Sequence, residues 1–378
     1  ALLGEEGLAP LSGELISREM HSTAARRKDA QDAVVAIRAI RRRELLRISV
    51  VDLCESEDIT VIAGALTDLT TASLDAALAA VTRGVELERG VGFPARMALV
   101  AMGRYGGHEL GYGSDADLMY VYDPIGDPQV AASMAKEITT RLAQLLAVPG
   151  SDPALEIDAS LRPEGRQGPM VRTLASYAAY YAKWSQVWEA QALLRADPLI
   201  GDPGLRAAFS QLIDPLRYPD SGLEAKEVTE IRRIKARVDE ERLPRGADPA
   251  THFKLGRGGL SDIEWTIQLL QMQYAGQYPK LQTTKTLDAL AAAVEAELID
   301  AEDAAQLGEA WRLASRARNA TVQVRGKPSD QLPRDARERA AVATILGYGP
   351  GSTDEMLNDY LRTARQARGV VDKIFWGD

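Results

Sequence analysis

The sequence predicts an α+β fold that is mostly helical, with a small mixed β-sheet between a helical lead-in and a C-terminal helical bundle. Two observations carry this prediction. Apolar residues recur at helical spacing over most of the chain, whereas short apolar runs bounded by glycine gather between residues 93 and about 172. A chain of 378 residues is long enough for two or three domains. We expect them at residues 1–92, 93–219 and 220–378.

The lead-in is predicted to be helical over about residues 12–92. Apolar residues such as Val34 and Ile37 recur at helical spacing there, with charged residues between them. The basic run Arg41–Arg43 lies within this segment and is followed by the acidic Glu44. We therefore interpret the run as a solvated helix face in preference to a nucleic-acid patch.

The middle of the chain is predicted to carry the strands. Residues 96–103 form a short apolar run that ends in glycine, which is typical of a buried strand followed by a turn, and residues 115–122 predict a second strand. An Asp-Pro pair is typical of a helix start and predicts a helix over residues 127–146. Residues 155–161 alternate between apolar and polar, which predicts a half-buried strand with Asp158 on its polar face.

The remainder is predicted to be almost wholly helical, over residues 173–213 and from residue 224 to the C-terminus. A glycine-rich loop at residues 246–259 separates two apolar helical stripes. The turn sequence Pro219–Gly222 is a plausible boundary between the sheet-containing part and the C-terminal bundle.

Composition excludes several classes of protein. The formal net charge of −9 disfavours binding to nucleic acid, and the hydrophobic content of 46% is that of a folded globular chain. A single cysteine, Cys54, and three histidines offer no zinc cluster and suit a reducing, cytoplasmic setting. Without an apolar run of about 18 residues or a signal-peptide layout, we expect neither a membrane span nor export. The chain begins with Ala1, so we also expect it to be a piece of a longer protein.

Chemistry-bearing residues gather between Val100 and Asp123. Gly106 and Gly107 follow the first predicted strand, and their missing side chains would let backbone N–H groups approach a phosphate. Asp115 and Asp117 lie two apart at the start of the next strand, so both carboxylates can face one point. Such a pair repels unless a cation or a proton lies between them, and Mg²⁺ is the preferred cation. Taken alone, the same residues also suit a turn cap and an exposed strand end.

A third acid strengthens the chemical interpretation. Asp158 lies in mid-strand, and Arg162 and Arg166 follow it. Three acids with two arginines can support metal-assisted phosphoryl or nucleotidyl transfer, in which arginines neutralise the leaving pyrophosphate and an acid accepts the proton of the nucleophile.

These residues carry a resemblance. The glycine pair, the Asp-x-Asp motif and the later strand acid resemble the signature of the DNA polymerase β-like nucleotidyltransferase superfamily. Four stretches together resemble the glutamine synthetase adenylyltransferase family: MGRYGGHELGYGSDADLMYVYD, EIDASLRPEGRQG, WEAQALLRAD and KLGRGGLSDIEW. They occur in the expected order between Met102 and Trp265, with helical segments on both sides.

The resemblance implies a function. Family members carry two similar catalytic halves: one transfers AMP from ATP to a tyrosine of glutamine synthetase, and the other removes it by phosphorolysis and releases ADP. One Asp-x-Asp unit implies one half, and the wording GYGSDAD is more similar to the adenylylating half. The alternatives are the removing half, a non-catalytic regulatory scaffold that binds glutamine synthetase or a PII-type sensor, and a small-molecule nucleotidyltransferase.

The resemblance also implies roles for single residues. Asp115, Asp117 and Asp158 match the catalytic carboxylates that bind Mg²⁺, two ions being expected, and Asp158 is the candidate to activate the acceptor hydroxyl. The residues expected to bind the nucleotide are Gly106, Gly107, Ser114, Arg104, Arg162, Arg166 and Arg195.

Two further motifs have structural and functional interpretations. Helical spacing places Trp184, Trp188, Gln191 and Arg195 on one side of a helix, which could floor a nucleotide pocket or brace the bundle. Ser261 and Glu264 form a predicted capping box. Asp262 favours the first turn through the helix dipole, and Lys254 and Arg257 could meet phosphate or a partner. His108 is interpreted as a solvated loop histidine in preference to a ligand contact.

Overall fold

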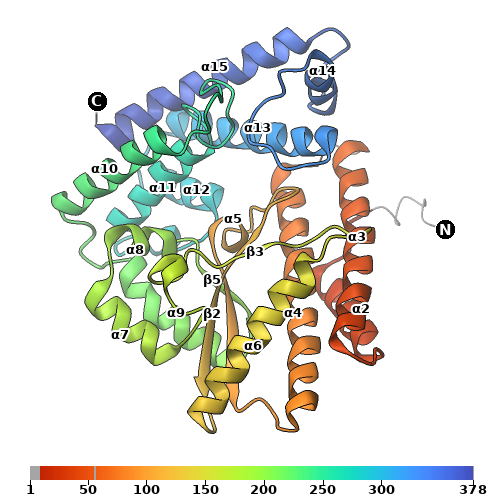
Figure 1. Ribbon diagram of the computed structural model, residues 1–378. Helices are drawn as coiled ribbons and strands as arrows, with labels where there is room; N and C mark the ends of the chain where they lie inside the picture. The colour runs from red at the N-terminus through yellow and green to blue at the C-terminus, as the bar shows by residue number, and fades with distance from the viewer. Residues whose placement is uncertain (1–8, 55–56, 378) are drawn as a thin grey trace. The chain divides into compact units, whose positions relative to one another are not determined.

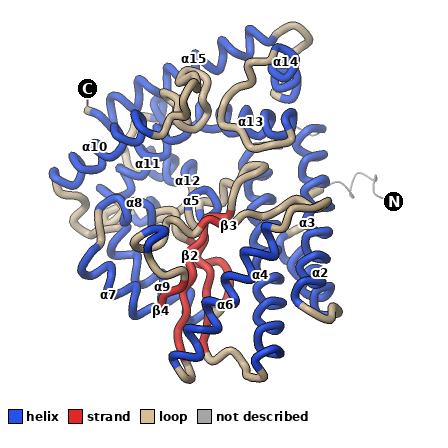
Figure 2. Tube along the Cα trace, in the orientation of Figure 1, coloured by secondary structure: helices blue, strands red, loops and turns tan. Residues whose placement is uncertain are grey.

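The computed structural model describes residues 9–54 and 57–377, and it confirms the predicted fold class (Figures 1 and 2). Helices make up 63% of it, around a small mixed sheet of five strands. The contacts divide the chain into two compact units, made of residues 1–110, 115–185 and 195–213 and of residues 111–114, 186–194 and 214–378. The three-domain division of the sequence stays a prediction.

The first unit begins with the three helices that the lead-in predicted: α2 (Gly13–Ala25), α3 (Ala30–Cys54) and α4 (Ile59–Arg89). They pack side by side in Figure 1. Helix α4 is long and apolar enough to cross a membrane by length and composition, which the expectation from the sequence overlooked. Within the structure, 67% of the most apolar stretch of α4 is buried. The apolar residues of α4 are therefore explained by its packing against α2 and α3.

The sheet of the first unit has the order β3-β2-β1-β5, and β4 also pairs with β2. Strand β1 (Ala95–Ala101) is antiparallel to β2 (Ala116–Pro124) and to β5 (Asp197–Gly201), whereas β3 (Ile157–Asp158) and β4 (Val171–Thr173) are parallel to β2. Both predicted strands before residue 125 are confirmed. The sheet is therefore mixed, as predicted.

Two predictions about strands are corrected. The alternating segment 155–161 forms only the two-residue strand β3, because the Asp158 carboxylate accepts a hydrogen bond from the Ser160 amide at 2.7 Å and turns the chain. The segment 173–213 is not wholly helical, since it contains β5. This strand is specified by pairing with β1, a contact about a hundred residues distant in sequence that local pattern does not reveal.

The remaining helices of the first unit flank the sheet. Helix α6 (Pro128–Ala147) begins as predicted, because the Asp127 carboxylate accepts hydrogen bonds from the next amides, Gln129 at 2.8 Å among them. Helix α7 (Leu174–Trp184) follows β4, and α9 (Pro203–Arg217) continues from the first unit into the second. The one-turn helix α5 (Gly103–Gly106) follows β1.

The basic run in α3 is the solvated face that the sequence predicted only in part, since Arg42 and Arg43 are exposed whereas Arg41 is buried. Arg41 is buried and donates to the Pro153 carbonyl, and burial, with the charge of Arg38 beside it, lowers the pKa of Arg41 to about 10. Arg42 forms an ion pair with Asp152 at 2.8 Å, and Arg43 forms one with Glu19. These arginines hold α3 against the chain after α6 and against α2, so the run is structural.

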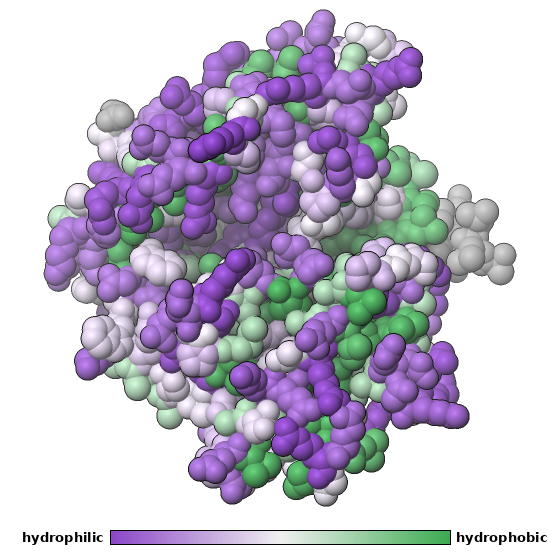
Figure 3. Space-filling view, viewed as in Figure 1, coloured by the Kyte–Doolittle hydropathy of each residue, from purple (hydrophilic) through white to green (hydrophobic). Residues whose placement is uncertain are grey.

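The second unit is helical. Its helices are α8 (Val187–Leu193), α10 (Ala225–Glu241), α11 (Leu260–Tyr274), α12 (Thr286–Glu295), α13 (Ala301–Arg325), α14 (Ala336–Ile345) and α15 (Thr353–Val371). Hydrophilic side chains cover the outer faces of α10 and α15 in Figure 3.

A buried ion network joins three of these helices. The Lys235 ammonium, which is 1% exposed, donates to Asp239 and to Asp262 at 2.5 Å, and Arg368 reaches Asp262 at 3.1 Å. Burial raises the pKa of Asp239 despite the neighbouring lysine. The Asp262 carboxylate also accepts the Gly258 amide at 2.8 Å. Asp262 is therefore the acceptor that connects α10, α15 and the glycine loop before α11.

This network replaces the predicted capping box. Helix α11 begins at Leu260 with Gly259 as its N-cap, so Ser261 already lies inside the first turn and caps nothing. Just before the helix, Gly258, at φ +71°, passes so close to α15 that a Cβ there would lie 1.9 Å from the Ala364 carbonyl, so a glycine is required at this position. The first-turn position of Asp262 is confirmed.

We expect Asp262→Ala to lower the free energy of unfolding by about 3 kcal/mol, because it leaves buried cationic groups without their shared acceptor. Chemical denaturation of the two proteins measures this change. The matched control is Glu240→Ala, an exposed acid on α10, which we expect to change stability by less than about 0.5 kcal/mol. Equal effects of the two substitutions would contradict a stabilising role for the network.

Candidate functional site

The predicted phosphate turn follows β1 and is packed too tightly for side chains. A Cβ on Gly106 would lie 1.9 Å from the Arg195 carbonyl, and one on Gly107 would lie 2.3 Å from the guanidinium of the same residue. The two glycines are therefore required by the close passage of the chain at Arg195. Their predicted contact with phosphate stays a prediction.

Two of the arginines expected to bind the nucleotide hold this turn together. Arg195 is buried, donates to the Gly103 carbonyl at 3.1 Å and forms an ion pair with the buried Glu109. Arg104 donates to the Glu109 carbonyl at 2.8 Å. In this arrangement both guanidinium groups have a structural partner, and Glu109 is a residue that the sequence interpretation missed.

His108 lies in the same turn and is not simply solvated. Its backbone is left-handed, at φ +56°, and its Nε2 lies 2.8 Å from a carboxylate oxygen of Asp197. Asp197 is the first residue of β5. The histidine thus links the turn to the strand that the sequence interpretation did not find, which explains why its partner was not predicted.

The three predicted acids come from two neighbouring strands. Asp117 and Asp158 are direct partners in the parallel pairing of β2 with β3, and Asp115 comes just before β2 and is exposed. The carboxylate of Asp117 lies against Gly103, where an added Cβ would be 2.4 Å from its Oδ2. The fold therefore brings two acids together at one end of the sheet, with the third two residues away along the chain.

This arrangement fits a divalent cation in part. Carboxylates on directly opposed residues of neighbouring strands point to the same side, which suits an oxygen-binding metal ion. Across residues 9–54 and 57–377, however, no three His, Cys, Asp or Glu side chains lie close enough to form a complete ligand set. Asp115, Asp117 and Asp158 could hold a metal only together with further oxygens, such as those of a phosphate.

A pocket of about 400 Å³ lies beside these strands. Four of the predicted site residues line it: Asp115, Asp158, Arg162 and Arg166. Its other lining residues are Tyr120, Ala143, Glu156, Ile157, Ala159, Ser160 and Met170. The pocket lies within the first unit. It is lined by carboxylates and guanidinium groups together with apolar side chains.

The two arginines of this pocket differ in their surroundings. Arg162 is buried and donates to the carbonyls of Ala159, at 2.6 Å, and Gly168, at 3.0 Å. It therefore fixes the loop that forms the pocket wall. Arg166 is exposed and lines the same pocket. Of the two, Arg166 has the accessible guanidinium.

The segment just before Asp115 is fixed by the second unit, to which residues 111–114 belong. The Ser114 hydroxyl accepts the Gly111 amide at 3.2 Å, and the Asn319 side-chain oxygen, on α13, accepts the Tyr112 amide at 3.3 Å. Arg318 approaches Ser114 at 3.5 Å. The sequence placed Ser114 in a phosphate loop but did not reveal Asn319, because its partner is 207 residues away.

The predicted row of aromatic and polar residues does not lie on one helix. Helix α7 ends at Trp184, α8 runs from Val187 to Leu193, and Arg195 follows it. Gln191 is buried and donates to Gln268 at 2.8 Å within the second unit, whereas Trp188 is exposed. The break between α7 and α8 removes the common face that the spacing predicted. Lys254 and Arg257 are exposed, and their predicted contact stays untested.

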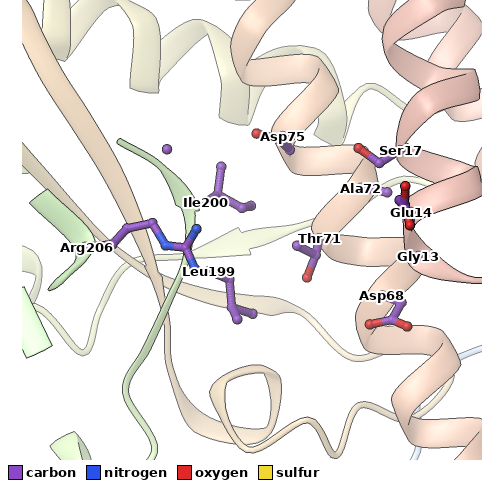
Figure 4. Close-up of a pocket in the computed structure, with 11 residues that line it drawn as sticks. Gly13, Glu14, Ser17, Asp68, Thr71, Ala72, Asp75, Leu199, Ile200 and Arg206 are labelled. Atoms are coloured by element: carbon purple, nitrogen blue, oxygen red, sulfur yellow. The ribbon is translucent and has the colours of Figure 1, made fainter. Parts of the chain in front are cut away.

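A second pocket in the first unit, of about 420 Å³, contains none of the predicted site residues (Figure 4). Carboxylates of Glu14, Asp68 and Asp75 lie on one side, and the Arg206 guanidinium lies on the other. His21 contacts Asp75 at 2.8 Å, and this hydrogen bond raises the pKa of the histidine. Asp75 therefore already has a hydrogen-bonding partner within the protein.

Comparison with known proteins decides the family. The model of glutamate-ammonia ligase adenylyltransferase matches residues 6–212, which is more than half of the chain. The chain belongs to this family. The model of GlnD PII-uridylyltransferase matches residues 232–375.

Relatives similar to this member of the family are named bifunctional glutamine synthetase adenylyltransferase/adenylyl-removing enzymes. The one from Streptomyces avermitilis is 50% identical over 99% of this chain, and the one from Mycolicibacterium smegmatis is 52% identical over 96%. This chain covers 39% and 36% of their respective lengths. It therefore corresponds to a part of such an enzyme.

We expect Asn319→Ala to speed amide hydrogen exchange at Tyr112 by about tenfold, the equivalent of one hydrogen bond of about 1.4 kcal/mol. Exchange measured by NMR or mass spectrometry tests this. Asn319→Asp keeps the acceptor oxygen and should restore slow exchange.

The control is Thr321→Ala, which removes the buried hydrogen bond from Thr321 to the Ala317 carbonyl on the same helix without touching residues 111–114. It should leave exchange at Tyr112 unchanged. If it accelerates that exchange as much as Asn319→Ala does, general loosening of α13 is the cause, and the proposed role of Asn319 is wrong.

Proposed function

We propose that this chain is the adenylylating half of a bifunctional enzyme, which transfers AMP from ATP to a tyrosine hydroxyl of glutamine synthetase and releases pyrophosphate. The observation that carries the proposal is the parallel pairing that sets Asp117 beside Asp158 at the end of the sheet. Family membership and the sequence motif GYGSDAD support adenylylation over removal of AMP. The removing half remains the second candidate, since the relatives are named for both activities.

The residues have defined roles in this proposal. Asp115, Asp117 and Asp158 would hold Mg²⁺, two ions being expected, and the bound metal would supply positive charge to the phosphate oxygens. Asp158 receives the proton of the acceptor hydroxyl as that oxygen attacks. Arg166 faces the leaving pyrophosphate from the accessible side of the pocket. Gly106 and Gly107 shape the turn beside the triphosphate, since their own amides donate to the Met102 and Gly103 carbonyls, and Ser114 provides a hydroxyl donor.

The other arginines act through the frame of the site. Arg104 and Arg195 keep the glycine turn in shape through Glu109, and Arg162 keeps the loop after β3 in shape. Their effect on nucleotide binding is therefore indirect in this proposal. This revises the direct phosphate contacts expected from the sequence.

We further propose a PII-type signal protein as a regulatory partner, because residues 232–375 match the model of a PII-uridylyltransferase. A cytoplasmic location is proposed from the single cysteine and the nature of the substrates. We propose no nucleic-acid partner and no membrane association.

The direct test is incubation of the chain with Mg²⁺, ATP labelled at the α-phosphate and unmodified glutamine synthetase, followed by measurement of label in the synthetase. The proposal expects transfer. Release of ADP from adenylylated synthetase with inorganic phosphate, and no forward transfer, would identify the removing half. Absence of both reactions would favour the scaffold.

Asp117→Asn or Asp115→Asn should lower the transfer rate by at least about a thousandfold, because each removes a charged metal ligand, and should leave the melting temperature within about 2 °C. Asp123→Asn is the matched control, an acid on the same strand that pairs with Arg96. It should keep its rate near that of the parent chain. Near-full activity of either site variant would rule out the metal assignment.

A further inference from the structure

The last residue of α7 is an exposed tryptophan. Tyr177, Tyr181 and Trp184 follow one another at spacings of four and three residues, which places them on one stripe of the helix. Tyr177 is 0% exposed and Tyr181 is 6% exposed, whereas Trp184 is 58% exposed. The first unit therefore covers this stripe along most of the helix and leaves its last aromatic side chain open.

Helix α7 packs against β2 and runs back along it (Figure 1). Thr173, the residue before the helix, is the register partner of Tyr122. One turn later, the Tyr177 hydroxyl donates to the Tyr120 carbonyl at 3.3 Å. Because Tyr120 is nearer than Tyr122 to the start of β2, the helix runs toward the start of that strand.

This direction brings the end of α7 to the end of the sheet that carries the predicted acids. From Tyr177 to Trp184 the helix advances about 10 Å. From Tyr120 back to Asp117 the strand covers about the same distance. The exposed indole is therefore level with Asp117, which pairs with Asp158.

The indole is a suitable anchor for a partner. The Lys183 ammonium lies 4.7 Å from the centre of the Trp184 ring, a cation–π contact that restricts the side chain. Met170, which is 37% exposed, adds a second apolar side chain at the pocket that Asp115 and Asp158 line. Tryptophan is enriched among the residues that contribute most to protein–protein binding.

The surroundings of the indole fit a protein better than a small molecule. Small ligands bind in concave sites that bury most of their surface. Trp184 lines neither the 400 Å³ pocket nor the 420 Å³ pocket. A protein partner instead covers about 800 Å², a disc of about 16 Å radius. Since α7 packs directly against β2, such a disc centred on Asp117 includes Trp184.

We propose that Trp184 is a docking residue for the acceptor protein and contacts the surface of glutamine synthetase beside the tyrosine that receives AMP. This inference rests on the proposed function, in which that tyrosine must reach the acids at the same end of the sheet. A second copy of the chain on this surface would cover the approach to the acids, so it fits less well. Docking at Trp184 would favour a protein acceptor over free tyrosine.

Trp184→Ala tests the proposal, because it removes the indole from an exposed position. Binding to unmodified glutamine synthetase is measured by biolayer interferometry with Mg²⁺ and an ATP analogue that carries a methylene bridge between the α- and β-phosphorus, which prevents transfer. We expect the Kd for glutamine synthetase to rise at least about tenfold. Trp184→Phe should restore most of the binding. The Kd for the analogue, measured by calorimetry, should stay unchanged.

Ile125→Ala is the matched control. Ile125 is 70% exposed and directly follows β2, at the end of the strand opposite to the acids. It lies about 26 Å from Asp117 along the strand, outside the disc that the partner covers. Its substitution should therefore leave the Kd for glutamine synthetase unchanged.

Each other outcome overturns a defined claim. Equal binding of glutamine synthetase by Trp184→Ala and the parent chain would overturn the docking role and leave the proposed function standing. Weaker binding of the analogue by Trp184→Ala would identify a nucleotide contact instead. If the parent chain self-associates in sedimentation and only Trp184→Ala prevents this, with unchanged binding of glutamine synthetase, the partner is a second copy. Failure of the parent chain both to bind glutamine synthetase and to transfer AMP to it would overturn the proposed function, and the inference with it.

Discussion

The parallel pairing of β3 with β2 is the constraint on which the rest of the site depends. It is only two residues long, yet it sets Asp158 directly opposite Asp117. Like charges on directly opposed residues destabilise a sheet unless a cation or a proton separates them. In the proposed function, a metal ion bound between these carboxylates would reduce the repulsion between them.

The surrounding polar residues form a rigid frame around that pair. Glu109 and Arg195 are both buried, and their ion pair stabilises the glycine turn. The Arg162 guanidinium donates hydrogen bonds to backbone carbonyls of the loop after β3. Removing one partner of a buried ion pair lowers stability by more than the intact pair raises it, because the remaining charge is left buried and unpaired. Buried ion pairs therefore keep the surrounding backbone in one geometry. Groups that carry out transfer need this kind of support, because small displacements of reacting atoms lower rates strongly.

Local patterns in the sequence predicted the elements whose causes are local. The helical periodicity of the lead-in, the Asp-Pro start of α6 and the two strands around the glycine turn were all confirmed. The acids were predicted from the residue spacing of a motif, which can be recognised without knowledge of the fold, and their catalytic role stays a prediction. Asp117 and Asp158 were expected to be near each other, and their pairing confirms it.

The features that sequence reasoning missed depend on distant partners. Strand β5 exists because β1 offers it an edge, and the role of Asn319 depends on an amide 207 residues away. The buried Arg41 looked like part of a solvated face because its partners lie after α6. Asp262 looked like a first-turn acid, although its carboxylate joins three elements through Lys235, Arg368 and Gly258. The local periodicity of the sequence does not reveal contacts between residues that are distant in sequence.

Binding of Mn²⁺ in place of Mg²⁺ tests the central claim most directly. Electron paramagnetic resonance counts free Mn²⁺ as protein is added in the presence of the methylene-bridged ATP analogue, for the parent chain and for Asp158→Asn. We expect the parent chain to bind the ion and Asp158→Asn to bind it at least tenfold more weakly, because the variant loses the carboxylate that the β2–β3 pairing supplies. Equal binding by both proteins would contradict the claim that this strand pairing builds the metal site.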